Sequence, residues 1–106
     1  MATRMQHDLF VHPDVRLRRA FPLVVLLQAD IAGGDQRIVA PMTPIGLAPR
    51  LSSRQVPIVR HDETNYSVFM PLMTTVSARA LRRPVGSIAA WRDDISRALD
   101  WLFFGI

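Results

Sequence analysis

The stretch Asp93-Asp-Ile-Ser-Arg-Ala-Leu-Asp-Trp-Leu-Phe-Phe-Gly-Ile106 closes the chain and carries a helical pattern. Here and just upstream, apolar residues recur at steps of three and four, the spacing of one helix face: Ile88, Trp91, Ile95, Ala98, Leu99 and Leu102. Ser87 is a candidate N-cap, because its hydroxyl can accept from the first free backbone N–H groups. Gly105 suits the residue that ends a helix. The pattern predicts one C-terminal helix from about Ser87 to Phe104.

The segment Trp101–Ile106 concentrates apolar side chains at a chain end, where polar residues are the rule. If the helix buries Leu102 with Phe103 or Leu99 inside its own domain, then Trp101 and Phe104 point in other directions. Exposed apolar surface of this kind marks an interface with a partner. The alternative is that the whole tail folds back into its own core.

The rest of the chain reads as short strands. Its eight prolines divide it into pieces too short for a long helix. Polar turns are expected at Asp30–Asp35 and His61–Asn65, and a proline-rich loop at Thr43–Leu51. The segments between them are rich in β-branched, aromatic and other apolar residues and predict five strands: Gln6–Val11, Leu23–Asp30, Gln36–Met42, Gln55–Arg60 and Tyr66–Leu72. This pattern favours a mainly β, mostly antiparallel domain, either a small barrel or a strongly bent sheet.

Composition limits the class of protein. The chain has 106 residues, of which 49% are hydrophobic and 21% charged, values typical of one soluble globular domain. It has no cysteine, which excludes disulfides, thiolate nucleophiles and cysteine-based metal sites. The start of the chain lacks the pattern of a signal peptide, and the apolar run Ala20–Leu27 is far shorter than the roughly 20 residues of a membrane-spanning helix. We therefore expect a cytoplasmic protein that does not enter a membrane.

The positive charge is carried entirely by arginine. The 13 basic residues include no lysine, and the formal net charge is +4. A GC-rich coding sequence explains this usage, and so does selection for bidentate pairing with carboxylates or phosphates. Only Arg18-Arg19 and Arg82-Arg83 are adjacent, so no nucleic-acid-binding arm is predicted and sequence-specific nucleic acid binding is not expected.

The three histidines do not form a convincing metal or acid–base site. His7 and His12 lie five residues apart in a predicted strand and turn, so they should not converge on one metal. His61 stands beside Asp62 and Glu63, where a solvated turn is the simpler interpretation. We expect no metal and no cofactor.

Other side chains do not suggest catalysis. Adjacent residues on a helix diverge by about 100°, so Asp93 and Asp94 do not form a carboxylate pair. Their place in the first turns favours interaction with the helix dipole, and Asp93 can pair with Arg97. The chain has no glycine-rich phosphate loop and no nucleophile elbow, so no catalytic residue is predicted.

Four segments together resemble the CcdB toxin family. Asp93–Ile106 is similar to the family's C-terminal helix, which ends in Phe-Trp-Gly-Ile. Leu26–Ile31 resembles its Val-Gln-Ser-Asp-Ile segment, Arg37–Met42 its Arg-Met-Val-Ile-Pro-Leu strand, and Val56–Val59 its Tyr-Pro-Val-Val strand. Each motif is weak alone, but the likeness runs in order and spacing from about Met5 to the C-terminus.

The resemblance implies a bacterial toxin of a type II toxin–antitoxin module, with one CcdB-like domain over residues 1–106. The implied fold is a small SH3-like antiparallel barrel with one C-terminal helix, shared by CcdB and MazF toxins, and the implied assembly is a homodimer. Such a toxin binds the A subunit of DNA gyrase and traps the gyrase–DNA cleavage complex, acting by binding and not as an enzyme. A CcdA-like antitoxin with a disordered C-terminal segment neutralises it, and the basic surface suits an acidic partner of this kind.

The resemblance also implies which residues make these contacts. The gyrase-binding positions of the family fall on Ile31, Asp100, Phe104, Gly105 and Ile106. The dimer interface falls on Leu102, Phe104, Gly105 and Ile106. Three family residues differ here: tryptophan is replaced by Phe104, asparagine by Asp100, and serine by Ala29. Replacing tryptophan by phenylalanine weakens stacking on a partner arginine by about 1 kcal/mol.

Two other functions remain open. A MazF-like endoribonuclease would need arginine and hydroxyl side chains over a scissile phosphate, for instance Arg18, Arg19 or Thr43. A non-toxic CcdB homologue would only bind an antitoxin-like partner.

Overall fold

Strand β3 (Gln36–Pro44) organises the sheet, because it pairs antiparallel with three other strands. One edge of β3 pairs with β2 (Leu23–Leu26). The other edge pairs first with β6 (Thr74–Ser77) and then with β5 (Thr64–Val68). A strand that serves different partners along its length bends the sheet, and this bend curls it towards a barrel.

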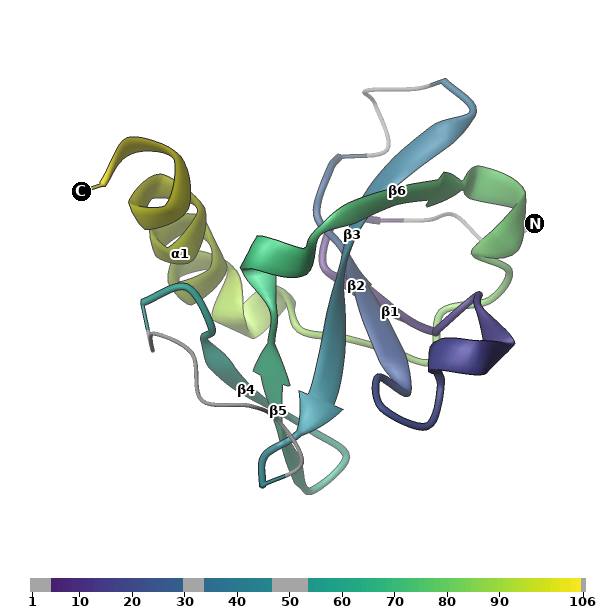
Figure 1. The fold of residues 1–106 in the computed structure, drawn as a ribbon, viewed down its shortest axis with the longest axis horizontal. Coiled ribbons are helices and arrows are strands. Elements are labelled where there is room, and N and C mark those ends of the chain that lie inside the picture. Colours follow the sequence, from purple (N-terminus) through teal and green to yellow (C-terminus); the bar gives the residue numbers. More distant parts are fainter. Residues whose placement is uncertain (1–4, 30–33, 47–53, 106) are drawn as a thin grey trace.

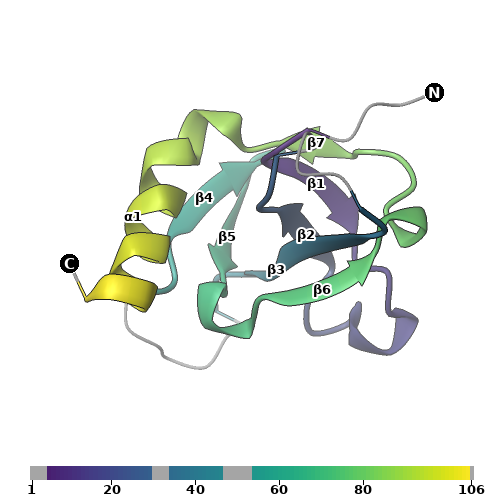
Figure 2. The ribbon, with the colours of Figure 1, turned by 90° about the horizontal axis from the view of Figure 1, so that it is seen from above.

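The remaining strands extend the sheet on both sides. Strand β1 (Asp8–Val11) pairs with β2, and β7 (Gly86–Ser87) pairs with β1. Strand β4 (Ile58–His61) pairs with β5, which gives the order β4-β5-β3-β2-β1-β7. In this computed structural model, which describes residues 5–29, 34–46 and 54–105, the sheet forms a nearly closed antiparallel barrel (Figures 1 and 2). The predicted mainly β barrel is confirmed.

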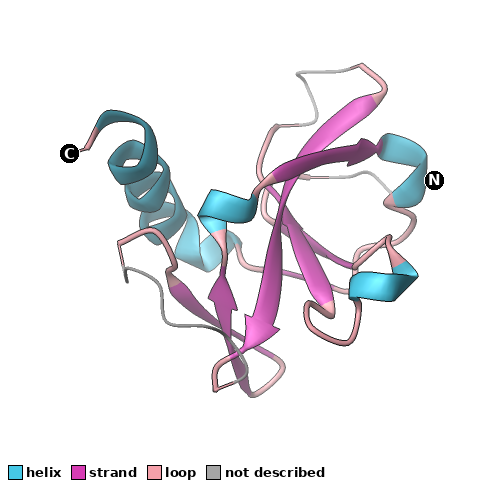
Figure 3. Ribbon diagram, in the orientation of Figure 1, coloured by secondary structure: helices cyan, strands magenta, loops and turns pink. Residues whose placement is uncertain are grey.

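Helix α1 (Arg92–Phe104) follows β7 through the 3-10 turn η5 (Ala89–Trp91). Figure 2 shows α1 lying alongside the barrel next to β4, and Figure 3 shows the one long helix against the strands. Within the described part of the chain, no helix has the length and apolarity needed to cross a bilayer.

The core forms two clusters of buried side chains. The larger cluster fills the barrel and the space beneath α1: Leu9, Leu23, Val25, Leu27, Ala40, Met42, Val59, Val68, Met70, Ile88, Ile95 and Ala98. The smaller cluster consists of Phe10, Val24, Leu26, Val39 and Leu81. Successive residues of β1 and β2 belong to opposite clusters, because side chains alternate between the faces of a strand.

All five predicted strands differ from the observed ones at one or both ends, and two strands were missed. Strand β1 begins at Asp8 and not at Gln6, and β2 ends at Leu26, short of the predicted Asp30. Strands β6 and β7 were not predicted, since β6 is a short, largely polar strand and β7 has only two residues. Strand β4 begins at Ile58 and not at Gln55. Strand β5 begins at Thr64 and ends at Val68, because the 3-10 turn η3 (Met70–Leu72), with Pro71 inside it, follows. The predicted turns at Asp30–Asp35 and Thr43–Leu51 lie partly outside the described residues, and β3 continues through Pro44.

The predicted C-terminal helix is confirmed, with helical residues from the start of η5 at Ala89 to Phe104, but its predicted N-cap is wrong. Ser87 lies in β7, and its Oγ accepts from the Ala89 backbone N at 3.2 Å. The N-cap of α1 is Trp91, which makes no side-chain capping bond. The expected pair between Asp93 and Arg97 does not form. Arg97 instead pairs with Asp94 at 3.4 Å, three residues away on the same helix face.

A tight hairpin and one glycine hold β7 against β4. The β4–β5 turn places Asp62 and Glu63 at φ values of 49° and 66°, as a two-residue type I′ hairpin requires. The turn that was expected at His61–Asn65 is therefore a two-residue hairpin. The His61 ring lies directly over Gly86, so closely that a β-carbon there would meet the ring. This contact ties the segment that leads into α1 to the β4–β5 hairpin.

Two histidines are buried. His7 and His12 are 8% and 6% exposed. The His12 Nδ1 accepts from the Asp14 backbone N at 3.1 Å, which requires that this nitrogen be unprotonated. Burial lowers the pKa of His12, and the Arg18 charge lowers it further against the opposing effect of Asp14. Burial also lowers the pKa of His7.

We expect Gly86→Ala to lower the free energy of unfolding by about 1 kcal/mol, because the new methyl group must push the His61 ring aside. Chemical denaturation measures the effect. In a His61→Ala background the ring is absent, so Gly86→Ala should cost much less stability there. The double variant should therefore be more stable than the sum of the two single losses predicts. Strict additivity of the two losses would contradict the packing of His61 on Gly86.

Stability should fall as the pH falls below about 6.5, the ordinary pKa of histidine. The unfolded chain then binds protons that the folded His7 and His12 resist, and this difference favours unfolding. In the His12→Asn variant the amide oxygen can still accept from Asp14, but the side chain does not titrate. The free energy of unfolding of this variant should therefore fall less between pH 7 and pH 5 than that of the wild-type protein. Urea denaturation at each pH measures the difference. An equally steep fall would show that His12 does not contribute.

Candidate functional site

The rotation of α1 is set by its buried face. Ile95 and Ala98 are 1% and 2% exposed, and Leu99 and Leu102 pack partly against the same cluster. These positions follow the helical repeat of about 100° per residue, so they share one stripe. The burial of this stripe decides which way every other residue of the helix points.

The opposite face of α1 carries an exposed aromatic side chain beside a carboxylate. Phe104 lies nine residues after Ile95, about 180° around the helix from it. Phe104 is 72% exposed, the most exposed large hydrophobic side chain in the described part of the chain. Asp100 is exposed and lies one turn before Phe104, so the two side chains are neighbours.

Gly105 ends the helix directly after Phe104. It adopts φ 71°, in the left-handed region, and its N–H donates to the Trp101 carbonyl at 3.0 Å. A glycine reaches this conformation without steric cost. The cap fixes the last turn, so Phe103 and Phe104, which are 63% and 72% exposed, are presented on formed helix.

A groove runs along a third side of α1. Its volume is about 500 Å³, and its helix wall is formed by four residues that share one stripe: Asp94, Arg97, Ala98 and Trp101. Arg54, Pro57 and Ile58 form the facing wall, just before and at the start of β4. Ile58 is 54% exposed, so the groove offers apolar surface to solvent.

Two charge contacts shape this groove. The guanidinium of Arg54 lies over the Trp101 ring, 4.3 Å from the ring centroid, which is cation–π geometry. Arg97 pairs with Asp94 at 3.4 Å, but both side chains are largely solvated, so the pair contributes little stability. The groove thus combines apolar surface with charged groups.

The structure brings some of the predicted site residues together and separates others. Asp100, Phe104 and Gly105 share the exposed end of α1. Leu102 is half-buried against the domain core, nearly opposite Phe104 around the helix. Ile31 and Ile106 lie outside the described residues.

The side chains considered for catalysis are not arranged as an active site. Thr43 is 1% exposed, so its hydroxyl does not reach solvent beside Arg18 or Arg19. Among the described residues, no three histidine or acidic side chains gather where they could hold a metal ion. Asp93 and Asp94 diverge on the first turn of α1, as expected for adjacent helical residues.

The groove beside Trp101 was not predicted from the sequence. Trp101 was expected to point away from the core, but its partner Arg54 lies 47 residues earlier, before β4. The pairing depends on how β4 lies beside α1, and a periodicity along one helix does not contain that information. The available signal in the sequence was the spacing of the four groove residues from Asp94 to Trp101, which places them on one stripe of the helix.

A comparison with protein-family models matches residues 6–105 to the family described as CcdB protein. A search of curated proteins finds no match. The family match includes the barrel strands, the whole of α1 and the Gly105 cap. Since it spans nearly all of the 106 residues, the chain belongs to the CcdB family.

Proposed function

We propose that this protein is the toxin of a type II toxin–antitoxin module and that it acts on DNA gyrase by binding. Family membership supports the coarser statement, a CcdB-type toxin. The more specific statement, action on gyrase by binding, is supported by the exposed end of α1. Phe104 projects on a capped helix beside Asp100, which is where the family resemblance puts the gyrase contact.

Binding alone is enough for poisoning. A ligand that prefers one conformation shifts the equilibrium towards it by its difference in affinity for the two states. A toxin that binds gyrase more tightly while the DNA is cleaved than after resealing therefore holds the enzyme in the cleaved state. An aromatic side chain in a desolvated pocket is a typical hot spot for such affinity.

The proposed target contact involves charge as well as apolar surface. Phe104 would stack on an arginine of the gyrase A subunit, and Asp100, one helical turn away, can pair with the same cation. In this arrangement the carboxylate compensates for the weaker stacking of phenylalanine compared with the family's tryptophan. The proposed site also includes Gly105, Ile31 and Ile106.

We propose further that the protein acts as a homodimer in the cytoplasm and that a CcdA-like antitoxin neutralises it. A net charge of +4 favours an acidic antitoxin segment that folds on binding. The burial of Thr43 disfavours the endoribonuclease alternative in the form that uses this hydroxyl. A non-toxic homologue would leave gyrase unaffected in the experiment that follows.

We expect Phe104→Ala to abolish trapping of cleaved DNA by purified gyrase with ATP and supercoiled plasmid, because it removes the exposed ring. Phe104→Trp should strengthen trapping by about 1 kcal/mol, roughly fivefold in the effective toxin concentration. Linearised plasmid after protease treatment is the readout. The matched control is Val15→Ala, which removes an equally exposed apolar side chain (70%) from the 3-10 turn η1 (Val15–Leu17) and should leave trapping unchanged. Full activity of Phe104→Ala would refute the proposed contact.

In sedimentation equilibrium the wild-type protein should have twice the 12.0 kDa mass of the chain. Phe104→Glu should shift it towards the monomer, because a desolvated charge at the interface opposes association. Val15→Glu, an equal change on η1, should remain dimeric. A wild-type monomer at micromolar concentration would rule out the dimer. If Phe104→Ala stays dimeric and fails to trap gyrase, the loss of trapping lies in the gyrase contact itself.

A further inference from the structure

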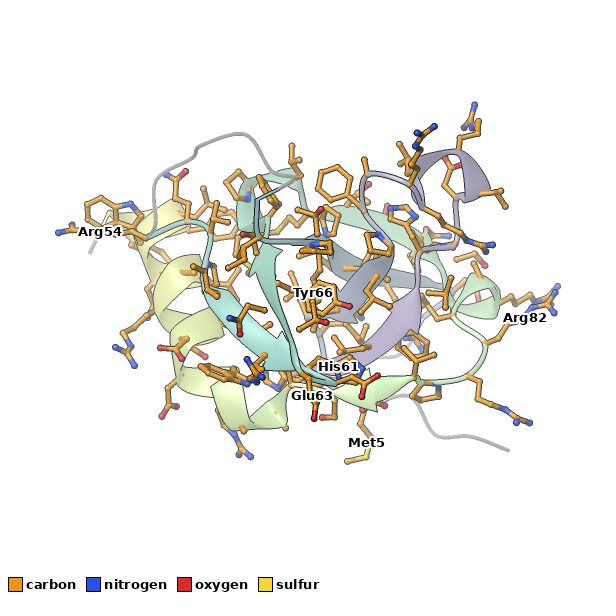
Figure 4. All side chains as sticks on the ribbon, turned by 90° about the horizontal axis from the view of Figure 1, so that it is seen from below. Met5, Arg54, His61, Glu63, Tyr66 and Arg82 are labelled. Atoms are coloured by element: carbon orange, nitrogen blue, oxygen red, sulfur yellow. The ribbon has the colours of Figure 1, made fainter. Side chains whose placement is uncertain are left out.

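The groove beside Trp101 has the size and the lining of a small-molecule site. Its volume of about 500 Å³ lies within the range of roughly 300–1,000 Å³ that is typical of ligand pockets. Pro57, Ile58 and Ala98 line it with apolar surface, and the Trp101 ring adds an aromatic wall. Figure 4 shows Arg54 at the α1 end of the molecule, where its guanidinium lies over the Trp101 ring. The groove thus places a cation beside apolar surface.

The charge of Arg54 is not balanced by an acidic side chain. Within residues 5–29, 34–46 and 54–105, Arg54 makes no ion pair and donates no hydrogen bond. Its contact with Trp101 is an attraction between the cation and the electrons of the ring, so the N–H donors of the guanidinium remain available to an acceptor. A carboxylate can accept from two of these donors in parallel.

The contact with Trp101 also prepares Arg54 for binding. The guanidinium lies 4.3 Å from the ring centroid, so the long side chain is held at the groove before a ligand arrives. A side chain that is already held in place loses less conformational entropy when it binds. The planar guanidinium then presents its donors in a fixed arrangement that matches a carboxylate.

The other charged side chains of the groove indicate a ligand with a single negative charge. Arg97 pairs with Asp94 at 3.4 Å, so these two side chains compensate each other. Arg54 is then the group whose positive charge a ligand can neutralise. Further negative charges on the ligand would be repelled by the Asp94 carboxylate, whereas a neutral ligand would leave Arg54 without an anionic partner.

We propose that this groove binds a small aromatic monocarboxylate. The carboxylate accepts from the guanidinium of Arg54, and the ring of the ligand packs between Ile58 and the edge of Trp101. Ile58 is 54% exposed, so covering it removes apolar surface from water. The Trp101 carbonyl also accepts from the Gly105 N–H at 3.0 Å, so the ligand contacts the helical turn that presents Phe104. The site goes beyond the proposed function, since it requires neither gyrase nor antitoxin.

A second groove, with a volume of about 580 Å³, provides a comparison within the same molecule. It lies around Arg82, which Figure 4 shows at the end of the molecule opposite Arg54. Its lining includes four arginines: Arg18, Arg79, Arg82 and Arg83. The aromatic side chain among its described lining residues, Phe10, is 1% exposed. An anion attracted by charge alone would prefer this second groove, whereas an aromatic carboxylate should prefer the groove beside Trp101.

The test is an NMR titration of the full-length, nitrogen-15-labelled protein with naphthoate. The chain has two tryptophans, Trp91 and Trp101, so its spectrum contains two indole N–H signals, and the Trp91→Phe variant assigns them. We expect a saturable shift of the Trp101 signal, while the signal of Trp91, which does not line the groove, should move little. Naphthamide, a neutral analogue of similar shape, should bind at least tenfold more weakly, because it forms no charge-assisted hydrogen bond.

Variants of the charged residues give the expected signs. Arg54→Gln should raise the dissociation constant of naphthoate about tenfold, because the charge and the parallel donors are lost. Arg54→Lys should give an intermediate loss, since lysine keeps the charge but not the planar fork. Asp94→Asn should lower the dissociation constant about twofold, because it removes a negative charge from the groove.

The matched control is Arg82→Gln, which removes the same charge at the opposite end of the molecule and should change the dissociation constant less than twofold. An equal loss in this control would overturn the proposal, as would equal binding of naphthamide. Acetate has the charge but no apolar body, so an equally strong effect of acetate would also overturn it. Shifts centred on the amides of Ala80 and Val85, beside the second groove, would do the same.

The absence of a saturable Trp101 shift at millimolar naphthoate would exclude the site. The assay contains no gyrase, so its outcome is independent of the proposed poisoning activity.

Discussion

The burial of one stripe of α1 against the barrel is the constraint on which the functional surface depends. Because Ile95 and Ala98 face the core, the helical repeat sets the direction in which every other side chain of α1 projects. Asp100 and Phe104 must face outward, and Trp101 must face the segment before β4. A helix with the same residues but a different rotation would bury the aromatic tail, which was the alternative interpretation of the sequence.

The sequence contained enough information for the fold class and for this rotation. The three- and four-residue spacing of Ile95, Ala98, Leu99 and Leu102 describes the buried stripe directly, since a helix repeats locally. The outward direction of Phe104 follows from the same spacing. The shape of the barrel was less accessible, because β6 is short and polar and is stabilised by pairing with β3, an interaction between residues 36 and 77 at its far end.

The parts of the surface that sequence reasoning missed are those made by distant segments. Arg54 meets Trp101 only because β4 lies beside α1. Gly86 must lack a side chain only because the hairpin carries His61 over it. Similarly, Arg82-Arg83 was visible as an adjacent pair, but Arg18 and Arg79 join it through the pairing of strands far apart in the sequence. Each of these groupings depends on long-range contacts that no local pattern encodes.

The two ends of the molecule differ in the side chains that they expose. The α1 end presents an exposed ring and a carboxylate on a capped helix, which suits a preformed cationic site on a folded target. The opposite end carries Arg82 and lies away from α1 (Figure 4), so the helix does not position the charges there. The surface proposed to contact gyrase can therefore change through residues of α1 alone, because the burial of Ile95 and Ala98 sets its orientation without any contribution from the far end of the barrel.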